Sequence, residues 1–435
     1  MAAGVLYFWG CGGGAPPGQP QSPQPPGPDQ TVPQCVPTTC AAARAACGTI
    51  PDGCGLTLSC GGCASGQACG GGGVPNACGA GGPVRGDLRW VTATPQPVLS
   101  ISSDRSGAAA ILYGDESGRT IARYDAAGKV LWSRSVSIGA DQITMDASGA
   151  IFILGFAEHA RGGPKIDRLS RDGASVTNLV PEGSDEGGFS RVSVNARGDW
   201  VYTRNIRGLD STIALHRADG AVVFLTERED LPLFFEAVAL DDSGNVAAAA
   251  YVRSELTFGG KTWRQGMALM KLSPDLEILW IQQLPQSGHI RTVATTRLGT
   301  VVALGYFDDR IAWGGATFYG GAVVFVAEAD GTPRFFRGLP PALRGDSWRL
   351  AVDPAGKMTL GATMPGCSGA MLEEINLAGD ELWNRLLTSD ACDATVEDVG
   401  TLAGSALAGG HFGGSVDFGK GPVFSGAGYL VDYAD

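Results

Sequence analysis

The chain has 435 residues, among them 66 glycines, 25 prolines and 11 cysteines, and only 17% of its residues are charged. Its 32 basic and 44 acidic residues give a net charge of −12, and without clustered basic residues we expect no binding to nucleic acid. No apolar run approaches the roughly 18–20 residues of a membrane span, and glycine has no collagen period, so membrane-spanning and triple-helical proteins are excluded. The glycine content favours turns and strands over helices.

The N-terminus resembles the end of a lipoprotein signal. Residues 1–11 form a partial signal of this type, in which an apolar stretch precedes Cys11, the predicted lipidation site. The stretch is short and lacks basic residues, which a start codon assigned too far downstream would explain. The alternative is a plain secreted protein in which Cys11 is incidental. Residues 12–34 are rich in Pro and Gly and predict an extended linker.

Residues 35–79 form a cysteine-rich segment with almost no large apolar side chains. Such a short segment needs cross-links or a metal for stability. We predict disulfides, with the pairing left open, because the spacing C-x-x-C occurs once, at Cys60 and Cys63, and no histidine accompanies it as a zinc site would require. Disulfides predict an extracytoplasmic location, either as an outer-membrane lipoprotein or secreted. The cysteines are Cys35, Cys40, Cys47, Cys54, Cys60, Cys63, Cys69 and Cys78.

The segment looks like small cysteine-rich modules that precede other domains in secreted bacterial proteins. It is also loosely similar to hevein-like chitin-binding knots. It lacks their adjacent Cys-Cys pair and their aromatic face.

Residues 86–435 repeat one unit, a short strand, a glycine turn and an apolar strand. A second hairpin lies between consecutive copies, so each repeat carries four strands. The turn glycines recur on average roughly every 50 residues, and four strands at this period predict a seven-bladed β-propeller. These glycines are Gly107, Gly149, Gly198, Gly244, Gly299, Gly356 and Gly404.

The last repeat lacks its fourth strand, and the first repeat is preceded by an extra one. Residues 86–94, GDLRWVTAT, resemble the fourth strands of other repeats. We therefore predict that Leu88–Thr92 pairs beside Gly428–Tyr433 and closes the ring. A tryptophan recurs in this strand, which predicts packing between neighbouring blades; the tryptophans are Trp90, Trp132, Trp280 and Trp383.

Two cysteines remain, Cys367 and Cys392, both in the sixth repeat. Each follows a strand whose exit lies on the same face of a four-stranded blade, so we predict a disulfide between them. The alternative is two separate buried thiols.

Three repeats carry insertions between their second and third strands, within 256–272, 311–329 and 416–434. Their pattern of Phe/Trp-Gly-Gly, Gly and an apolar strand resembles the bacterial β-propeller repeats called SBBP repeats, which implies a secreted or cell-surface propeller. Aromatic residues on glycine-rich loops are typical of recognition surfaces; alternatively, they fold back over the blade edges. These residues are Phe258, Trp263, Trp313, Phe318, Tyr319 and Phe424.

The sequence offers no recognisable catalytic machinery. Its four histidines lie in separate repeats, and no nucleophile elbow or phosphate loop occurs. We therefore predict no catalytic residue, metal or cofactor. The patterns of sialidases and quinoprotein dehydrogenases are only partly matched.

The predicted function is a secreted or outer-membrane-anchored surface protein with a binding or scaffolding propeller. We expect a monomer that binds a protein or polysaccharide at the cell surface and touches the membrane only through its lipid. One alternative is a scaffold for outer-membrane assembly, which predicts a periplasmic partner. The other is a propeller enzyme (hydrolase, lyase or quinoprotein), which predicts acidic or basic residues converging at the propeller axis.

Overall fold

The structure is a computed structural model, and its chain separates into two compact units, residues 1–80 and 81–435. The lipoprotein-type segment with Cys11 and the linker 12–34 lie outside the described residues. The described ranges are 37–47, 49–51, 57–63, 67–69, 76–80, 85–104, 106–115, 117–137, 139–156, 164–180, 187–206, 211–226, 231–258, 260–284, 288–313, 316–340, 348–365, 369–402, 404–424 and 428–434.

The first unit is held by disulfides around two short hairpins. Strand β1 (Thr49–Pro51) pairs with β2 (Thr57–Ser59), and β3 (Gln67–Cys69) pairs with β4 (Cys78–Ala80). Disulfides join Cys40 to Cys60 and Cys63 to Cys78, and Cys47 is also disulfide-bonded. This confirms a disulfide-rich module, and both C-x-x-C cysteines are oxidised rather than available to zinc. Cys35, Cys54 and the side chain of Cys69 lie outside the description.

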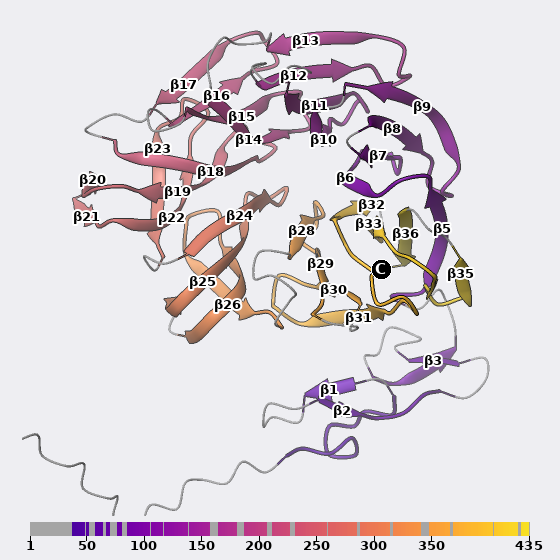
Figure 1. Cartoon of the computed structure of the whole chain (residues 1–435). Helices are drawn as coiled ribbons and strands as arrows, with labels where there is room; N and C mark the ends of the chain where they lie inside the picture. The colour runs from indigo at the N-terminus through magenta and orange to yellow at the C-terminus, as the bar shows by residue number, and fades with distance from the viewer. Residues whose placement is uncertain are drawn as a thin grey trace, which may run out of the picture. The chain divides into compact units, whose positions relative to one another are not determined.

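The second unit is a ring of seven four-stranded antiparallel sheets, as predicted (Figure 1). Blade 1 contains β6 (Val98–Ser103), β7 (Ala109–Asp115), β8 (Gly118–Tyr124) and β9 (Val130–Val136). Blade 2 contains β10 (Ala140–Met145), β11 (Ile151–Phe156), β12 (Pro164–Leu169) and β13 (Val176–Val180). Blade 3 contains β14 (Gly187–Val194), β15 (Trp200–Ile206), β16 (Ser211–His216) and β17 (Val222–Thr226).

The remaining four blades follow in chain order. Blade 4 contains β18 (Leu233–Leu240), β19 (Val246–Val252), β22 (Gly266–Leu272) and β23 (Ile278–Gln283). Blade 5 contains β24 (Gly288–Thr295), β25 (Val301–Trp313), β26 (Ala316–Ala327) and β27 (Pro333–Gly338). Blade 6 contains β28 (Arg349–Val352), β29 (Met358–Thr363), β30 (Ala370–Ile375) and β31 (Glu381–Leu387). Blade 7 contains β32 (Asp398–Leu402), β33 (Ser405–His411), β36 (Gly428–Ala434) and β5 (Leu88–Thr94).

Blade 7 closes the ring by pairing the two ends of the propeller chain. In Figure 1 the purple strand β5 lies beside the yellow strand β36. Gly428 pairs with Thr94 at one end of the ladder, Tyr433 pairs with Leu88 at the other, and Trp90 lies opposite Asp432. The predicted closing strand is therefore confirmed, and closure removes an exposed sheet edge.

The predicted insertions are short excursions between the second and third strands of blades 4, 5 and 7. Strands β20 (Leu256–Phe258) and β21 (Lys261–Trp263) form one extra hairpin, and β34 (Ser415–Asp417) and β35 (Pro422–Phe424) form another. In blade 5, β25 and β26 simply extend their ladder as far as the pair Trp313 and Ala316.

The turn glycines have a conformational reason. Gly149 has a φ of 84°, in the left-handed region that glycine tolerates best. Its N–H donates to the Asp146 carbonyl at 2.9 Å, and the Ala150 N–H donates to the Asp146 Oδ1 at 2.9 Å. An aspartate three residues before a glycine therefore fixes the turn that ends each such innermost strand.

The recurring tryptophans join neighbouring blades, as predicted. Each of three indole N–H groups donates to a turn carbonyl of the next blade at 3.0–3.1 Å. The indole also packs on that turn's glycine: a Cβ on Gly128 would lie 2.5 Å from the Trp90 ring. The hydrogen-bonded pairs are Trp90 with Ala126, Trp132 with Arg171, and Trp280 with Ala329.

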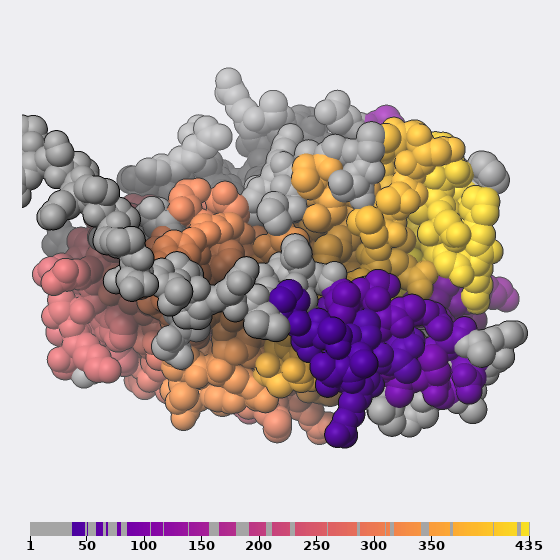
Figure 2. Space-filling view, turned by 90° about the horizontal axis from the view of Figure 1, so that it is seen from below, coloured from indigo at the N-terminus to yellow at the C-terminus, as the bar shows by residue number. Residues whose placement is uncertain are grey.

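The same contact between a tryptophan and a glycine occurs between blades 6 and 7. A Cβ on Gly86, just before β5, would lie 3.1 Å from the Trp383 ring, so Gly86 occupies the place of the missing turn glycine in blade 7. Buried aliphatic side chains fill the spaces between blades, among them Ile101, Ile111 and Leu430 at the seam between blades 1 and 7. Figure 2 shows the later blades, from orange to yellow, packed side by side.

The predicted disulfide between Cys367 and Cys392 can be followed at one of its two cysteines. Cys392 is disulfide-bonded, whereas its predicted partner, Cys367, lies outside the described residues. The pairing of these two cysteines therefore stays a prediction. Within the described ranges the chain contains no helix with the length and apolar character of a membrane span.

Candidate ligand-binding channel

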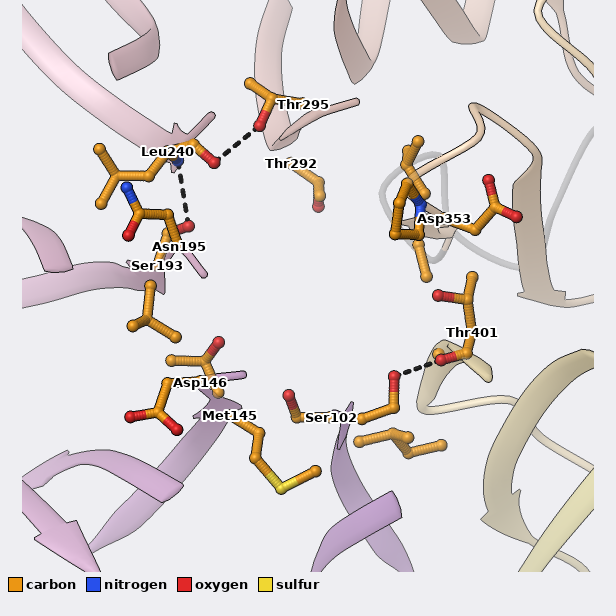
Figure 3. Close-up of a pocket in the computed structure, with 18 of the residues that line it drawn as sticks. Ser102, Met145, Asp146, Ser193, Asn195, Leu240, Thr292, Thr295, Asp353 and Thr401 are labelled. Carbon is orange, nitrogen blue, oxygen red and sulfur yellow. Dashed lines mark hydrogen bonds between the residues drawn. The ribbon is translucent and has the colours of Figure 1, made fainter. Parts of the chain in front are cut away.

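A cavity of about 610 Å³ lies at the centre of the ring. Its wall is built from the first, innermost strand of every blade and from the turns that follow. Figure 3 shows these side chains arranged around an open centre. Because all seven blades contribute one strand, the cavity brings together residues that are far apart in the chain. Ser103 and Thr401, for example, are hydrogen-bonded although 298 residues separate them.

Hydroxyl side chains stand among apolar ones in the middle of the wall. Ser193 accepts a hydrogen bond from the Leu240 N–H at 3.2 Å, and Thr295 donates to the Leu240 carbonyl at 2.8 Å. These bonds fasten blades 3, 4 and 5 to one another. Ser102 and Thr144 also line the cavity.

At one end of the channel, which we call the turn end, carboxylates pair with buried cations. The Arg123 Nη2 lies 2.5 Å from the Asp104 Oδ2, and the two side chains are only 2% and 1% exposed. The Arg123 Nη1 donates to the Gly149 carbonyl of the next blade at 2.6 Å. Lys271 repeats this arrangement, with its Nζ 3.0 Å from the Asp241 Oδ2 and 2.8 Å from the Gly299 carbonyl.

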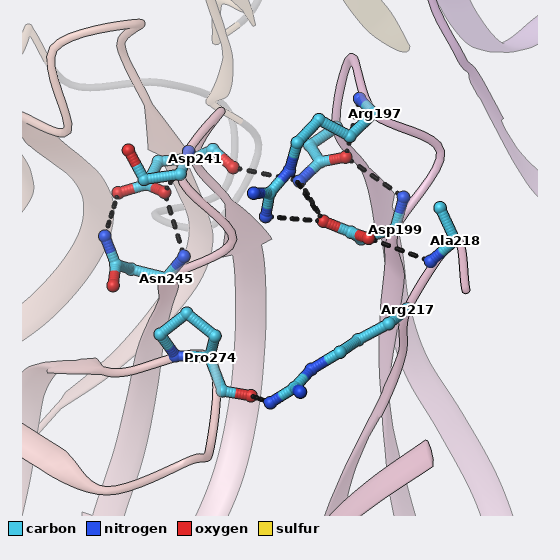
Figure 4. A network of polar contacts seen from close by, with 9 residues as sticks. Arg197, Asp199, Arg217, Ala218, Asp241, Asn245 and Pro274 are labelled. Atoms are coloured by element: carbon cyan, nitrogen blue, oxygen red, sulfur yellow. Dashed lines mark hydrogen bonds and ion pairs between the residues drawn. The ribbon is translucent and has the colours of Figure 1, made fainter. Parts of the chain in front are cut away.

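In blade 3, different residues link the turn to the neighbouring blade (Figure 4). Asn195 stands where the turns of blades 1, 2, 4 and 6 have aspartate, and its Nδ2 donates to the Asp241 carbonyl of blade 4 at 3.1 Å. Arg197 donates to Asp199 at 2.7 Å, and Arg217 reaches the Pro274 carbonyl of blade 4 at 2.6 Å. Asn195 and Arg217 therefore join blade 3 to blade 4.

At the opposite end, the strand-start end, Arg191 of β14, Arg349 of β28 and Asp398 of β32 line the cavity. The Asp398 carboxylate accepts two backbone hydrogen bonds, from the Ile101 N–H at 2.7 Å and the Val399 N–H at 3.0 Å. The Arg349 Nε donates to the Glu397 carbonyl at 2.7 Å. These contacts fix the carboxylate and the Arg349 side chain by backbone groups.

Burial perturbs both signs of charge at this end. It raises the pKa of the Asp398 carboxyl above its ordinary value, although the Ile101 N–H and Arg191 act in the opposite direction. Burial also lowers the pKa of the Arg191 guanidinium; Asp398 opposes this shift, whereas Arg349 and Arg291 add to it. The Arg191 cation therefore lies in a poorly solvated place, close to like charges.

Most of the insertion aromatics lie against the blades. Trp313 is 5% exposed, and Phe258, Trp263 and Phe318 are partly buried against the same cores. Tyr319 is 77% exposed. The side chain of Phe424 lies outside the description. Burial favours the fold-back interpretation for the first four, and the recognition role of these loops stays a prediction.

The described residues bring together one group with metal-ligand character, the sulfurs of Cys47, Cys63 and Cys78. All three are disulfide-bonded, so they cannot serve as thiolate ligands in this state. The wall of the channel offers no histidine or cysteine among the described residues.

The sequence analysis missed Arg191, Arg349 and Asp398. Each lies immediately before an apolar residue of an innermost strand, at the position where blades 1 and 2 have Ser100 and Gln142. A ring diagram of this position would have revealed converging charges, which the enzyme alternative predicted at the axis.

No known protein family matches the chain, and no curated protein sequence matches it. Solved structures that are similar include a catalytically inactive virginiamycin B lyase from Staphylococcus aureus with quinupristin, at 11% identity and a TM-score of 0.49, over 79% of this chain and 99% of that one. The β-propeller domain of the trilobed protease from Pyrococcus furiosus is similar at 8% identity and a TM-score of 0.47, over 72% and 91% of the two chains. At these identities the similarity concerns the propeller fold alone.

Proposed function

We propose that this protein is an extracytoplasmic binding protein whose propeller holds a small polar ligand in its central channel. The observation that carries this proposal is the cavity of about 610 Å³ with hydroxyl and amide side chains on its wall. Ligand pockets of about 300–1,000 Å³ with a few placed polar groups are typical of small-molecule sites. The disulfides support an oxidising compartment.

The location is proposed together with the binding role. Lipidation at Cys11 or plain secretion would both place the propeller outside the cytoplasm. The recognition loops predicted from the sequence receive support only from Tyr319, which is exposed. The channel is the better candidate because its polar side chains converge on one cavity.

The test is to screen the full chain against soluble mono- and disaccharides and to repeat positive titrations with Thr144→Trp. Thr144 lines the cavity, so an indole there fills space that the ligand needs, and we expect binding to fall at least about tenfold. Tyr319→Ala, on an insertion loop, is the matched control and should bind like the unchanged protein. Loss of binding in Tyr319→Ala but not in Thr144→Trp would move the site to the loops.

A second candidate function is an enzyme with its site in the same channel. The observation that favours it is the convergence of Arg191, Arg349 and Asp398, in which burial raises the pKa of the carboxyl towards the range useful to a general acid. Incubation with a bound ligand decides between the two: a binding protein returns it unchanged, whereas turnover that disappears in Asp398→Asn, with binding retained, identifies an enzyme.

A further inference from the structure

The Arg191 side chain reaches across the channel. Arg191 belongs to blade 3, yet its Nη2 donates to the Arg291 carbonyl of blade 5 at 3.3 Å. Its guanidinium also interacts electrostatically with Asp398 of blade 7 and Arg349 of blade 6. In a ring of seven blades, blades 6 and 7 stand across the axis from blade 3. The guanidinium therefore lies near the axis, where it forms part of the cavity wall.

Two arginines and one aspartate line this end of the cavity. Among the described residues, the charged side chains that line the strand-start end are Arg191, Arg349 and Asp398, two cations and one carboxylate. The carboxylate already accepts hydrogen bonds from two backbone N–H groups. Further from the wall, Glu236 accepts the Ile290 N–H at 3.1 Å. Both guanidiniums interact electrostatically with the Asp398 carboxylate.

The turn end shows what the same fold does when a cation serves only the structure. Arg123 and Lys271 each have a carboxylate of their own, at 2.5 and 3.0 Å, and each is about 97–98% buried away from the cavity, at 2% and 3% exposure. Arg191 and Arg349, by contrast, are half-buried because they face the cavity. Guanidinium groups are forked donors that bind planar oxyanions with two parallel hydrogen bonds.

We propose that Arg191 and Arg349 bind the anionic group of the ligand, and that this ligand is a small hydroxylated carboxylate of the sugar-acid class. This inference rests on the proposed function and names its ligand class. The carboxylate of the ligand lies between the two guanidiniums. Its hydroxyl groups extend towards Ser102 and Thr144 in the middle of the channel, where the wall supplies both donors and acceptors.

The experiment is isothermal titration calorimetry of the full chain with D-glucuronate, with D-glucose and with inorganic phosphate. Glucuronate and glucose differ in the charged group and share the hydroxylated ring. We expect glucuronate to bind at least about tenfold more tightly, as charge-assisted hydrogen bonds require. Weak phosphate binding that competes with glucuronate is expected from the shared oxyanion chemistry, whereas binding of phosphate without glucuronate would overturn the sugar-acid assignment.

Variants locate the anion. Arg191→Gln and Arg349→Gln should reduce glucuronate affinity to that of glucose and leave glucose binding within twofold. Arg297→Gln is the matched control, because Arg297 lines the same cavity at the turn end, and it should change glucuronate affinity less than twofold. Arg191→Lys keeps the charge without the fork, so its affinity should lie between those of the unchanged protein and Arg191→Gln.

The outcomes separate this inference from the proposed function. Equal affinity for glucuronate and glucose, with both lost in Thr144→Trp, would overturn the anion site and leave the channel as a site for neutral ligands. Glucuronate binding that is insensitive to both arginine variants would also overturn the inference. Absence of binding by glucuronate and phosphate to the unchanged protein, with other saccharides bound in the channel, would overturn the sugar-acid class alone.

Discussion

The two ends of the propeller channel use charged residues in opposite ways. At the turn end, Arg123 and Lys271 are sealed between blades with their own carboxylates and with a backbone carbonyl of the next blade. At the strand-start end, Arg191 and Arg349 face the cavity and share Asp398. The pairs at the turn end belong to blades 1 and 4, and the residues at the strand-start end belong to blades 3, 6 and 7.

The difference teaches where the fold is fixed and where it is free to bind. A sealed cation must keep its partner, because an isolated buried charge is costly. A cation that faces a cavity can gain hydrogen bonds to a ligand that enters it. Stability and ligand affinity should therefore respond to different arginines, and the predictions below test this separation.

The largest effect is expected at the turn end. Arg123→Met keeps much of the side-chain volume but leaves Asp104, which is 1% exposed, without its cation. We expect the free energy of unfolding to fall by about 3–5 kcal/mol, the usual cost of breaking a buried ion pair. Urea denaturation followed by circular dichroism measures it.

Arg168→Met is the matched control in blade 2. Arg168 also pairs with a turn aspartate, with its Nη2 3.2 Å from the Asp146 Oδ2, but its side chain is 46% exposed. Solvent screening reduces such a pair to about 0–1 kcal/mol. Equal losses in the two variants would show that burial does not decide the strength of these ion pairs.

Opposite pH dependences should distinguish the two ends next. Although burial raises it, hydrogen bonds from Asn245 and Lys271 lower the pKa of Asp241 overall. Asp241 therefore stabilises the fold above its ordinary pKa of 3.8, and this stabilisation is lost as the pH falls through its folded-state pKa. In Asp241→Asn this acid-induced loss should be smaller than in the unchanged protein.

Asp398 should show the reverse sign. Because burial raises its pKa, the folded state holds a proton that the unfolded state has released, so its contribution to stability falls as the pH rises above 3.8. Asp398→Asn should remove this decline, seen as the difference between the two urea titrations at each pH. Taking the difference cancels other groups that titrate in the same direction, such as Glu373, whose pKa burial raises to about 7. The stability difference between variant and unchanged protein should therefore have opposite pH slopes for Asp241→Asn and Asp398→Asn. Slopes of the same sign would contradict the assignment.

The sequence predicted the fold well because the fold depends on local and repeated signals. Gly149 needs a positive φ, and Trp90 needs a glycine to pack on in the next blade, so both leave a mark in every copy that uses them. The closing strand could be found because Trp90 resembles Trp132 in an otherwise unmatched segment. Such residues can be recognised from the sequence around them or from the period of the repeat.

The channel site could not be predicted in the same way. Arg191, Arg349 and Asp398 occupy one structural position in three blades, where blades 1 and 2 have Ser100 and Gln142, so no single residue type repeats around the ring. Their meeting depends on Arg191 reaching groups that lie 100 or more residues away in the chain, the Arg291 carbonyl and Asp398. Only ring closure brings them together.

The smallest effect on stability is expected for Arg191→Gln, the variant that should abolish glucuronate binding. Loss of this cation removes repulsion by Arg349 and Arg291, while Asp398 keeps its two backbone donors at 2.7 and 3.0 Å. The free energy of unfolding should therefore change by less than about 1 kcal/mol, several-fold less than for Arg123→Met. With saturating glucuronate, the unchanged protein should become more stable and Arg191→Gln should not. If Arg191→Gln were instead as destabilised as Arg123→Met, Arg191 would serve the stability of the fold. The charged residues at both ends of the channel would then be structural.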